Sequence, residues 1–237
     1  MIPISDDRLE GAGRPYVTLA LIAINVAVYL VLQPTIPAVG AIDRLPAEIA
    51  AFYDHWALVP ARIAHGQALY TLLSAMFLHG GLGHLGGNML YLWIFGDNVE
   101  EALGHGRFLL FYLFCGILAA LLQVLLFPAS ETWTLGASGA IAGVLGAYLV
   151  LYPRAMVRVL FVLLWIRIGR LRASVLIAFW FAIQLWSGAG QLALAGAGGG
   201  QEGGVAYWAH VGGFGAGFLI ARSLRSRLGP GTLGRSA

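Results

Sequence analysis

Residues 132–153 read TWTLGASGAIAGVLGAYLVLYP, a stretch without a charged side chain that lies between Glu131 and Arg154. The stretch is continuously apolar and does not alternate between polar and apolar positions, so it indicates a helix rather than a half-exposed strand. At about 1.5 Å per residue, a helix of this length crosses the hydrocarbon core of a bilayer. The stretch therefore predicts a transmembrane helix.

The composition of the whole chain agrees with a membrane location. Hydrophobic residues make up 59% of the 237 residues and charged residues 11%, against about 45–50% and about 25% in soluble domains. So few charges cannot cover a water-soluble surface. The composition also excludes a disordered chain, a collagen-like repeat, a disulfide scaffold (Cys115 is the single cysteine) and a conventional nucleic-acid binder.

Charged residues divide the chain into six apolar runs. Six such runs predict an all-α polytopic membrane protein with six transmembrane helices, because backbone groups in lipid must be bonded within helices or closed barrels. A β-barrel is disfavoured because the runs do not alternate. Acidic residues ahead of the first run argue against a cleaved signal peptide. The runs are 15–42, 63–96, 108–130, 132–153, 173–201 and 203–221.

The arginines set the predicted topology. All 14 basic residues are arginines, and if both termini are inside the cell only Arg44 and Arg62 lie outside. Inner loops of membrane proteins carry the excess of positive charge, so the N- and C-termini are predicted to be cytoplasmic. The inner arginines are Arg8, Arg14, Arg107, Arg154, Arg158, Arg167, Arg170, Arg172, Arg222, Arg225, Arg227 and Arg235.

Three connecting segments carry further expectations. Residues 157–166 (VRVLFVLLWI) are too short to span the membrane and are interpreted as an interfacial segment of an inner loop. Residues 34–68 contain the apolar pattern AFYDHWALVP and are expected to pack on or in the membrane. Residues 187–204 are glycine-rich and are expected to be mobile.

Ser138 and His210 are polar residues inside predicted spans, where polar side chains are costly and mark candidate functional sites. Each lies about 10 Å below the outer surface, at about 1.5 Å per residue from the start of its span. Both spans run from outside to inside, so a hydroxyl and an imidazole lie at one level. A serine beside an imidazole base is an activated nucleophile. The pair predicts acyl transfer, with no carboxylate in either helix core as a third member.

Small residues would let these two spans approach closely. Gly139 and Gly143 are four residues apart, as are Gly213 and Gly217, and this spacing permits close backbone contact.

His84 and Asn88 are candidate donors to an oxyanion. They are four residues apart on one face of a span that runs parallel to the other two, and both side chains can donate hydrogen bonds. Gly136, just before Ser138, would leave the Ser138 backbone N–H free as a further donor.

Each signal also has an interpretation without catalysis. A GxSG sequence in a membrane helix can be a packing motif, and His84 with Asn88 can join helices. His210 can be a structural histidine or a proton relay. No grouping has metal-ligand spacing, since His79 and His84 are five residues apart.

Together the motifs identify a family resemblance. The pieces are His84-Leu-Gly-Gly-Asn88, Gly136-Ala-Ser138-Gly139 and Ala209-His210-Val-Gly-Gly213-Phe-Gly-Ala-Gly217. In this order the chain resembles a rhomboid intramembrane serine protease of the bacterial six-helix type over residues 15–222. Any one motif is weak, but three in register with six spans are specific.

The resemblance implies a domain organisation. A cytoplasmic segment 1–14 precedes a rhomboid-like six-transmembrane-helix bundle in residues 15–222, and an arginine-rich cytoplasmic tail 223–237 follows. The second span is placed after a loop formed by residues 66–81. The implied spans are 17–33, 82–98, 108–127, 136–152, 173–188 and 205–222.

The resemblance also implies roles for site residues. Ser138 would be the nucleophile and His210 the general base, and the oxyanion donors would be His84, Asn88 and the Ser138 N–H. Gly136 and Gly139 would shape the turn at Ser138. Gly213 and Gly217 would set the contact between the fourth and sixth spans.

The function implied is that of an intramembrane serine endopeptidase, which hydrolyses peptide bonds in or near transmembrane helices of other proteins without cofactor or metal. It would lie in a bacterial cytoplasmic membrane, among its lipids, with the active site facing outward. One alternative is a rhomboid-like pseudoprotease that binds or escorts membrane helices. Another is a transporter or channel, which would need polar residues through the full membrane depth.

Two positions depart from the family pattern. Tyr70-Thr71 stand where many members have a Trp-Arg pair in the first loop, so the anchoring of that loop is open. Ala142 stands where some members have an aromatic residue against the base histidine, so the orientation of His210 is open, with Tyr207 or Trp208 as candidate partners.

Overall fold

The charge-free runs are largely helical in the computed structural model, which describes residues 1–6, 13–35, 45–162, 166–197 and 205–225. The first helix, α1, continues into a π-helical turn, η1, that ends just before Gln33. Three later helices carry the motifs: α5 contains the His84 motif, α7 begins at Ser138 and α9 contains His210. The bounds are α1 Tyr16–Ala27, η1 Val28–Leu32, α5 Leu82–Leu103, α6 His105–Leu126, α7 Ser138–Leu151, α8 Ala173–Gly196 and α9 Tyr207–Leu224.

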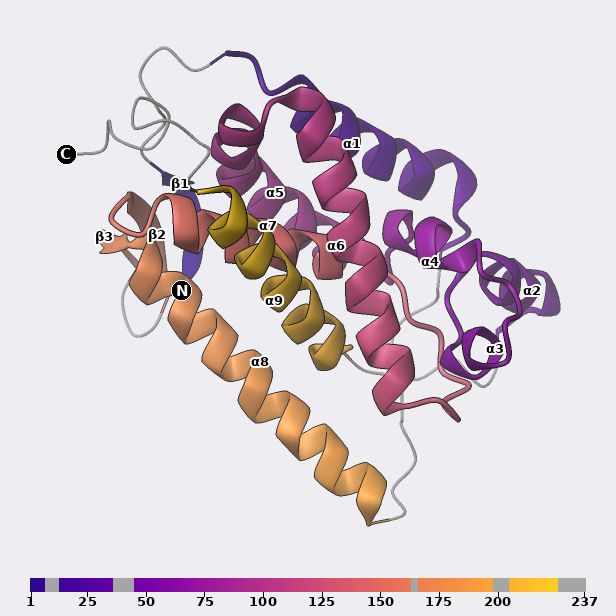
Figure 1. Cartoon of the computed structure of the whole chain (residues 1–237). Coiled ribbons are helices and arrows are strands. Elements are labelled where there is room, and N and C mark those ends of the chain that lie inside the picture. The colour runs from indigo at the N-terminus through magenta and orange to yellow at the C-terminus, as the bar shows by residue number, and fades with distance from the viewer. Residues whose placement is uncertain (7–12, 36–44, 163–165, 198–204, 226–237) are drawn as a thin grey trace.

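Helix α7 lies at the centre of the bundle, with α5, α6 and α9 packed around it (Figure 1). Nearly all of its side chains are buried, including Ala142, Val144 and Tyr148. Helix α8 lies on the outside of the bundle and packs on α9. The residue that begins α7, Ser138, is therefore held by the most buried helix of the chain.

Large apolar side chains remain exposed on the outer helices. Leu125 on α6 is 72% exposed, and Trp186 on α8 is 84% exposed. Helices α6 and α8 are long and apolar enough to cross a membrane by length and composition, whereas α1 with η1 and α7 are apolar but shorter. An apolar surface of this kind is suited to lipid rather than to water.

A three-stranded antiparallel sheet departs from the all-α expectation. Its order is β1-β2-β3, with β1 Ile2–Asp6, β2 Met156–Val162 and β3 Ile166–Arg172. Most of the segment read as interfacial is thus the middle strand. Val157 and Val159 are fully buried while Arg158 between them is exposed, which is the period-two pattern of a strand. The sheet lies at the opposite end of the bundle from α2, α3 and α4 (Figure 1).

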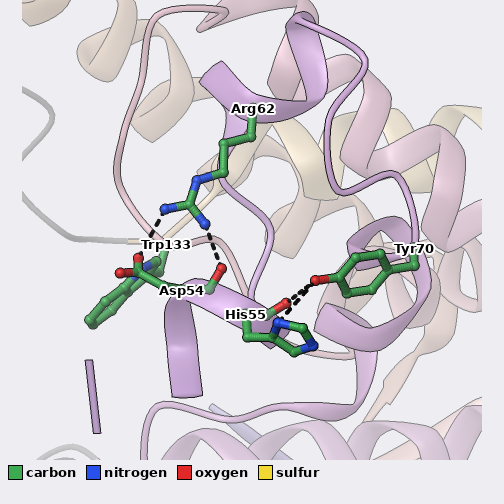
Figure 2. Close-up of polar contacts among 5 residues, drawn as sticks. All are labelled: Asp54, His55, Arg62, Tyr70 and Trp133. Atoms are coloured by element: carbon green, nitrogen blue, oxygen red, sulfur yellow. Dashed lines mark hydrogen bonds and ion pairs between the residues drawn. The ribbon is translucent and has the colours of Figure 1, made fainter. Parts of the chain in front are cut away.

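The first long loop is a folded unit built from α2 Ala47–Trp56, α3 Pro60–Ala64, α4 Thr71–Ser74 and the 3₁₀ turn η3 Ala75–Phe77. Polar contacts fasten it (Figure 2). Asp54 pairs with Arg62 at 3.4 Å and accepts a hydrogen bond of 2.9 Å from Trp133 Nε1, in the loop before α7. Tyr70 donates to the backbone oxygen of His55 at 2.8 Å. Tyr70 therefore anchors the loop to the end of α2, at the position where the resemblance left the anchoring open.

The remaining loop expectations are settled only in part. Helix α8 continues to Gly196, eight residues beyond the implied span end at 188, so much of the glycine-rich segment 187–204 is helical. Residues 198–204 of that segment, and residues 226–237 of the tail, lie outside the described residues.

Candidate active site

Ser138 and His210 are in direct contact. The Nε2 atom of His210 lies 2.8 Å from the Oγ atom of Ser138, although the residues are 72 positions apart. His210 is 8% exposed. The equal depth read from the sequence thus corresponds to a hydrogen bond between α7 and α9.

Glycines allow the two helices to come this close. A Cβ atom at Gly213 would overlap the carbonyl oxygen of Gly139, and a Cβ atom at Gly217 would overlap that of Gly143. The expected contact of α9 with α7 is therefore made by backbone against backbone. Gly139 also faces α6, where a Cβ atom would lie 2.7 Å from that of Ala119, so it is a packing position between three helices.

The other nitrogen of His210 contacts a residue that the sequence interpretation missed. Nδ1 lies 2.8 Å from Oε1 of Gln184 on α8. The Trp180 ring lies one turn earlier on α8, with its centroid 5.8 Å from that of His210. A glutamine in a charge-free run was the available signal in the sequence, since intramembrane polar residues mark candidate sites. Neither aromatic named as a candidate takes this place, and Trp208 instead donates to the Gly188 oxygen at 2.9 Å.

Gly136 brings His84 and Asn88 to the start of α7. Its φ of +126° lies in the region that favours glycine. A Cβ atom there would stand 2.8 Å from His84 Nε2 and 3.7 Å from Asn88 Nδ2. Both side chains of the predicted oxyanion site therefore face the backbone two residues before Ser138.

These groups present hydrogen-bond donors without acceptors. The Gly80 N–H donates to His84 Nδ1 at 3.2 Å. The neutral ring then carries its proton on Nε2, the atom beside Gly136. Asn88 Nδ2 is buried without a partner among the described residues. The N–H of Ser138, at the first position of α7, has no acceptor in the described part of the chain either.

The first loop fixes the segment that leads into α7. Leu58 and Thr134 form an antiparallel bridge, with N–H···O distances of 3.1 and 2.7 Å. The Gly136 N–H donates to the Ala75 oxygen at 2.9 Å, and this sets the peptide plane two residues before Ser138. Loop and serine are thus one hydrogen-bonded unit.

His79 lies behind His84, just ahead of α5. Its ring is fully buried and packs edge-on against the His84 ring, with centroids 5.1 Å apart. Gln33 holds its backbone, accepting from the His79 N–H at 2.8 Å and donating to its carbonyl oxygen. Gln33 also donates to Tyr53 at 2.8 Å. Gln33, just after η1, thereby holds His79 in place behind His84.

The arrangement has the parts that acyl transfer requires. A hydroxyl contacts an imidazole, the imidazole contacts an oriented amide, and unpaired donors lie beside the hydroxyl's backbone. Within the described residues, no group of three His, Cys, Asp or Glu side chains could hold a metal ion.

Comparison with known proteins gives one family throughout. The family model of the Rhomboid domain matches residues 66–227. Rhomboid protease GluP of Bacillus subtilis is 34% identical over 154 residues, which cover 61% of this chain and 26% of that protein. RHOMBOID-like protein 6, mitochondrial, of Arabidopsis thaliana is 38% identical over 88 residues, 37% of this chain and 28% of that protein.

A yeast protein extends the comparison. Rhomboid protein 1, mitochondrial, of Saccharomyces cerevisiae is 37% identical over 92 residues, 37% of this chain and 26% of that protein. The matched part of the chain spans little more than a quarter of the length of each of these relatives. The shared region includes the segments that carry the four polar residues of the candidate site, since the family match begins at residue 66 and ends at residue 227.

Proposed function

The chain belongs to the rhomboid family of membrane proteins, and from this membership we propose that it is an intramembrane serine endopeptidase. It hydrolyses a peptide bond in or near a transmembrane helix of another membrane protein, without cofactor or metal. The observation that carries the proposal is the 2.8 Å contact between Ser138 Oγ and His210 Nε2, because an adjacent base is what makes a serine nucleophilic.

The reaction proceeds in two halves. Ser138 Oγ forms a bond to the substrate carbonyl carbon while its proton passes to His210 Nε2. Collapse of the tetrahedral intermediate breaks the peptide C–N bond, and the same proton passes to the leaving amine. In the second half, water gives its proton to Nε2 and attacks the acyl group, and Ser138 regains a proton as the acid product leaves.

The oxyanion of each intermediate is stabilised at Gly136. The donors are His84 Nε2–H, Asn88 Nδ2–H and the Ser138 N–H. The two side chains lie beside Gly136, and Asn88 Nδ2 has no partner among the described residues. Donors fixed in advance are worth more than water in a low-dielectric site, since they need no reorganisation during the reaction. Their shared position supports a role in charge stabilisation over one in joining helices.

The substrate must present an unwound backbone. Peptide bonds within a helix are shielded, so a transmembrane segment has to open locally before its carbonyl reaches Ser138. Glycine or proline in the substrate lowers the cost of opening, because both are poor helix formers.

The membrane topology is part of the same proposal. Six spans, formed by α1 with η1, α5, α6, α7, α8 and α9, place both termini in the cytoplasm by the arginine distribution. The site then faces the outer side of a bacterial cytoplasmic membrane. Relatives named for mitochondria mean that family membership alone does not assign the membrane.

Cleavage in liposomes tests the proposal. The purified chain is reconstituted with a single-span substrate whose helix contains glycine, and wild type is compared with Ser138→Ala and His210→Ala. Ser223→Ala is the control, because its exposed hydroxyl donates to the Ile220 oxygen of its own helix. We expect cleavage by wild type and the control, and none by the two site variants.

Other outcomes would redirect the proposal. Cleavage that persists in Ser138→Ala at matched purity would reject the assigned nucleophile. A folded wild type that binds such helices but cuts none of a panel would favour the pseudoprotease alternative.

A further inference from the structure

We infer that Gln184 is a positioning residue for His210: its amide oxygen accepts a hydrogen bond from Nδ1–H and thereby leaves the lone pair of Nε2 facing Ser138. The inference deepens the proposed function and rests on it for its catalytic meaning. The tautomer of His210 can nevertheless be measured without any substrate.

Among the described residues, each nitrogen of His210 has one hydrogen-bonding partner. Nε2 lies 2.8 Å from Ser138 Oγ, and Nδ1 lies 2.8 Å from Gln184 Oε1. A neutral imidazole carries a single N–H, so one nitrogen donates and the other accepts. The partner of Nδ1 therefore decides whether Nε2 can take the proton of Ser138.

A glutamine could in principle favour either tautomer, because its amide has an oxygen that accepts and a nitrogen that donates. If the NH₂ group faced His210, Nδ1 would be the acceptor and Nε2 would carry the hydrogen. Nε2–H would then donate to Ser138 Oγ and could not act as a base. The direction of the amide is thus the point on which the inference depends.

A second contact fixes this direction. Gln184 Nε2 donates to the backbone oxygen of Trp180, one helical turn earlier, at 3.1 Å. A carbonyl oxygen can only accept, so the amide nitrogen must face Trp180 and the amide oxygen must face His210. Gln184 is 6% exposed, so no bulk water competes for either end. The helix backbone of α8 therefore sets the tautomer of a histidine on α9.

Burial explains why an amide suits this place. In a serine protease triad a carboxylate orients the histidine. Here the partner would be buried, and an ionised carboxylate would carry a large desolvation cost unless it were fully paired. An amide oxygen gives the same hydrogen bond without a net charge. The Trp180 ring, 5.8 Å from the imidazole centroid, lies within the range in which an aromatic face attracts a cation.

The first measurement is the tautomer itself. ¹⁵N-histidine NMR of the full-length chain in detergent micelles separates Nδ1–H from Nε2–H rings, and His210→Asn assigns the signal. We expect wild-type His210 to be the Nδ1–H tautomer. Gln184→Met should populate both tautomers, because methionine keeps the length of the side chain but is only a weak hydrogen-bond acceptor. Gln191→Met, two turns along α8, is the matched control and should leave the signal unchanged.

The second measurement is the steady-state kinetics of cleavage. We expect Gln184→Met to lower kcat by about 10²-fold with little change in KM, since ground-state substrate binding does not involve Gln184. Gln184→Glu should retain the tautomer and most of kcat, because a protonated carboxyl group can donate to the Trp180 oxygen and accept from Nδ1–H. A role limited to packing would not distinguish Gln184→Met from Gln184→Glu.

The two measurements test different claims, so either claim can be rejected without the other. An Nε2–H ring in wild type, or an Nδ1–H ring unchanged in Gln184→Met, would overturn the inference whether or not the chain cleaves anything. If Gln184→Met does not fold, Gln184→Glu decides: loss of the Nδ1–H signal in that variant rejects the inference. Absence of wild-type cleavage with the expected tautomer would instead reject the proposed protease activity.

Discussion

Gly213 on α9 lies so close to Gly139 on α7 that a Cβ atom at Gly213 would overlap the Gly139 carbonyl oxygen. Gly139 follows Ser138 directly, and Gly213 lies one turn after His210. A close backbone contact of the two helices is therefore adjacent to the Ser138–His210 hydrogen bond. The hydrogen bond between Ser138 and His210 therefore depends on a close helix contact that only glycine permits.

Gly213→Ala should separate the two helices and abolish cleavage. The neighbouring atom is backbone and cannot rotate away, so overpacking should cost about 1–3 kcal/mol of stability. A displacement near 1 Å at the site costs about 10²-fold in rate. Cleavage kinetics and thermal unfolding in detergent measure both effects. Gly215→Ala is the control, because nothing lies within 4 Å of a Cβ atom there. Equal loss in both variants would count against the contact.

Gly136→Ala should remove activity, with an effect on folding similar to that of Gly213→Ala. Alanine at a φ of +126° is strained by about 1–3 kcal/mol, and its Cβ atom would press on His84 Nε2. The donor ring would then turn away from Ser138. Gly86→Ala on α5 has open space and should behave as wild type. Steady-state kinetics distinguish these two variants. A normal kcat in Gly136→Ala would show that catalysis does not require the present position of His84.

Asn88→Ala should lower kcat by about 10²–10³-fold and leave KM nearly unchanged, as expected when one oxyanion donor is lost. The amide nitrogen has no partner among the described residues, so its removal breaks no visible hydrogen bond of that nitrogen and should alter folding little. His84→Ala combined with Asn88→Ala should cost less than the product of the single losses, because both act on one charge. A rise in KM alone would indicate substrate binding instead.

The proximity of Ser138 and His210 could be predicted because both lie at one depth in spans that start at known charges, and because glycines mark the contact. The same reasoning placed His84 and Asn88 on one face of α5. Their catalytic roles remain proposals. The depth and the helix face of these residues could be predicted because both follow from local patterns in the sequence.

Gln184 could not be assigned in this way. It lies 26 positions from His210, and its partner depends on how α8 packs on α9, which no motif encodes. Strand β1 was missed for a similar reason, since its partner β2 begins only at Met156. The hairpin of β2 with β3 is local, but two strands alone are only marginally stable. Val157 to Val159 showed a short alternation, but a strand has no stability without the partner that tertiary structure supplies.

Glu100→Gln should destabilise the fold without changing the chemistry. The buried carboxylate accepts from the Val17 and Thr18 N–H groups at 2.9 and 2.7 Å and from Thr18 Oγ1 at 2.6 Å, at the start of α1. An amide can present only one oxygen, so buried donors should be left unpaired at a cost of about 1–3 kcal/mol. Glu101→Gln is the control, because its exposed side chain accepts from the Gly13 N–H and can still do so through the amide oxygen. The temperature of thermal unfolding in detergent should fall for Glu100→Gln only.

His79 should make the fold sensitive to acid. This residue precedes α5, outside the spans, and burial lowers the pKa of its ring to about 4 from an ordinary 6.5. The unfolded chain therefore binds a proton between pH 6.5 and pH 4 that the folded chain does not, so stability falls as the pH drops through that window. The loss amounts to about 3 kcal/mol and levels off below pH 4. In His79→Phe the free energy of unfolding, measured in detergent across this range, should decline less steeply than in wild type. His65→Phe alters an exposed histidine and should keep the wild-type slope. Parallel slopes for wild type and His79→Phe would mean that the His79 ring takes up its proton in the folded chain as readily as in the unfolded one.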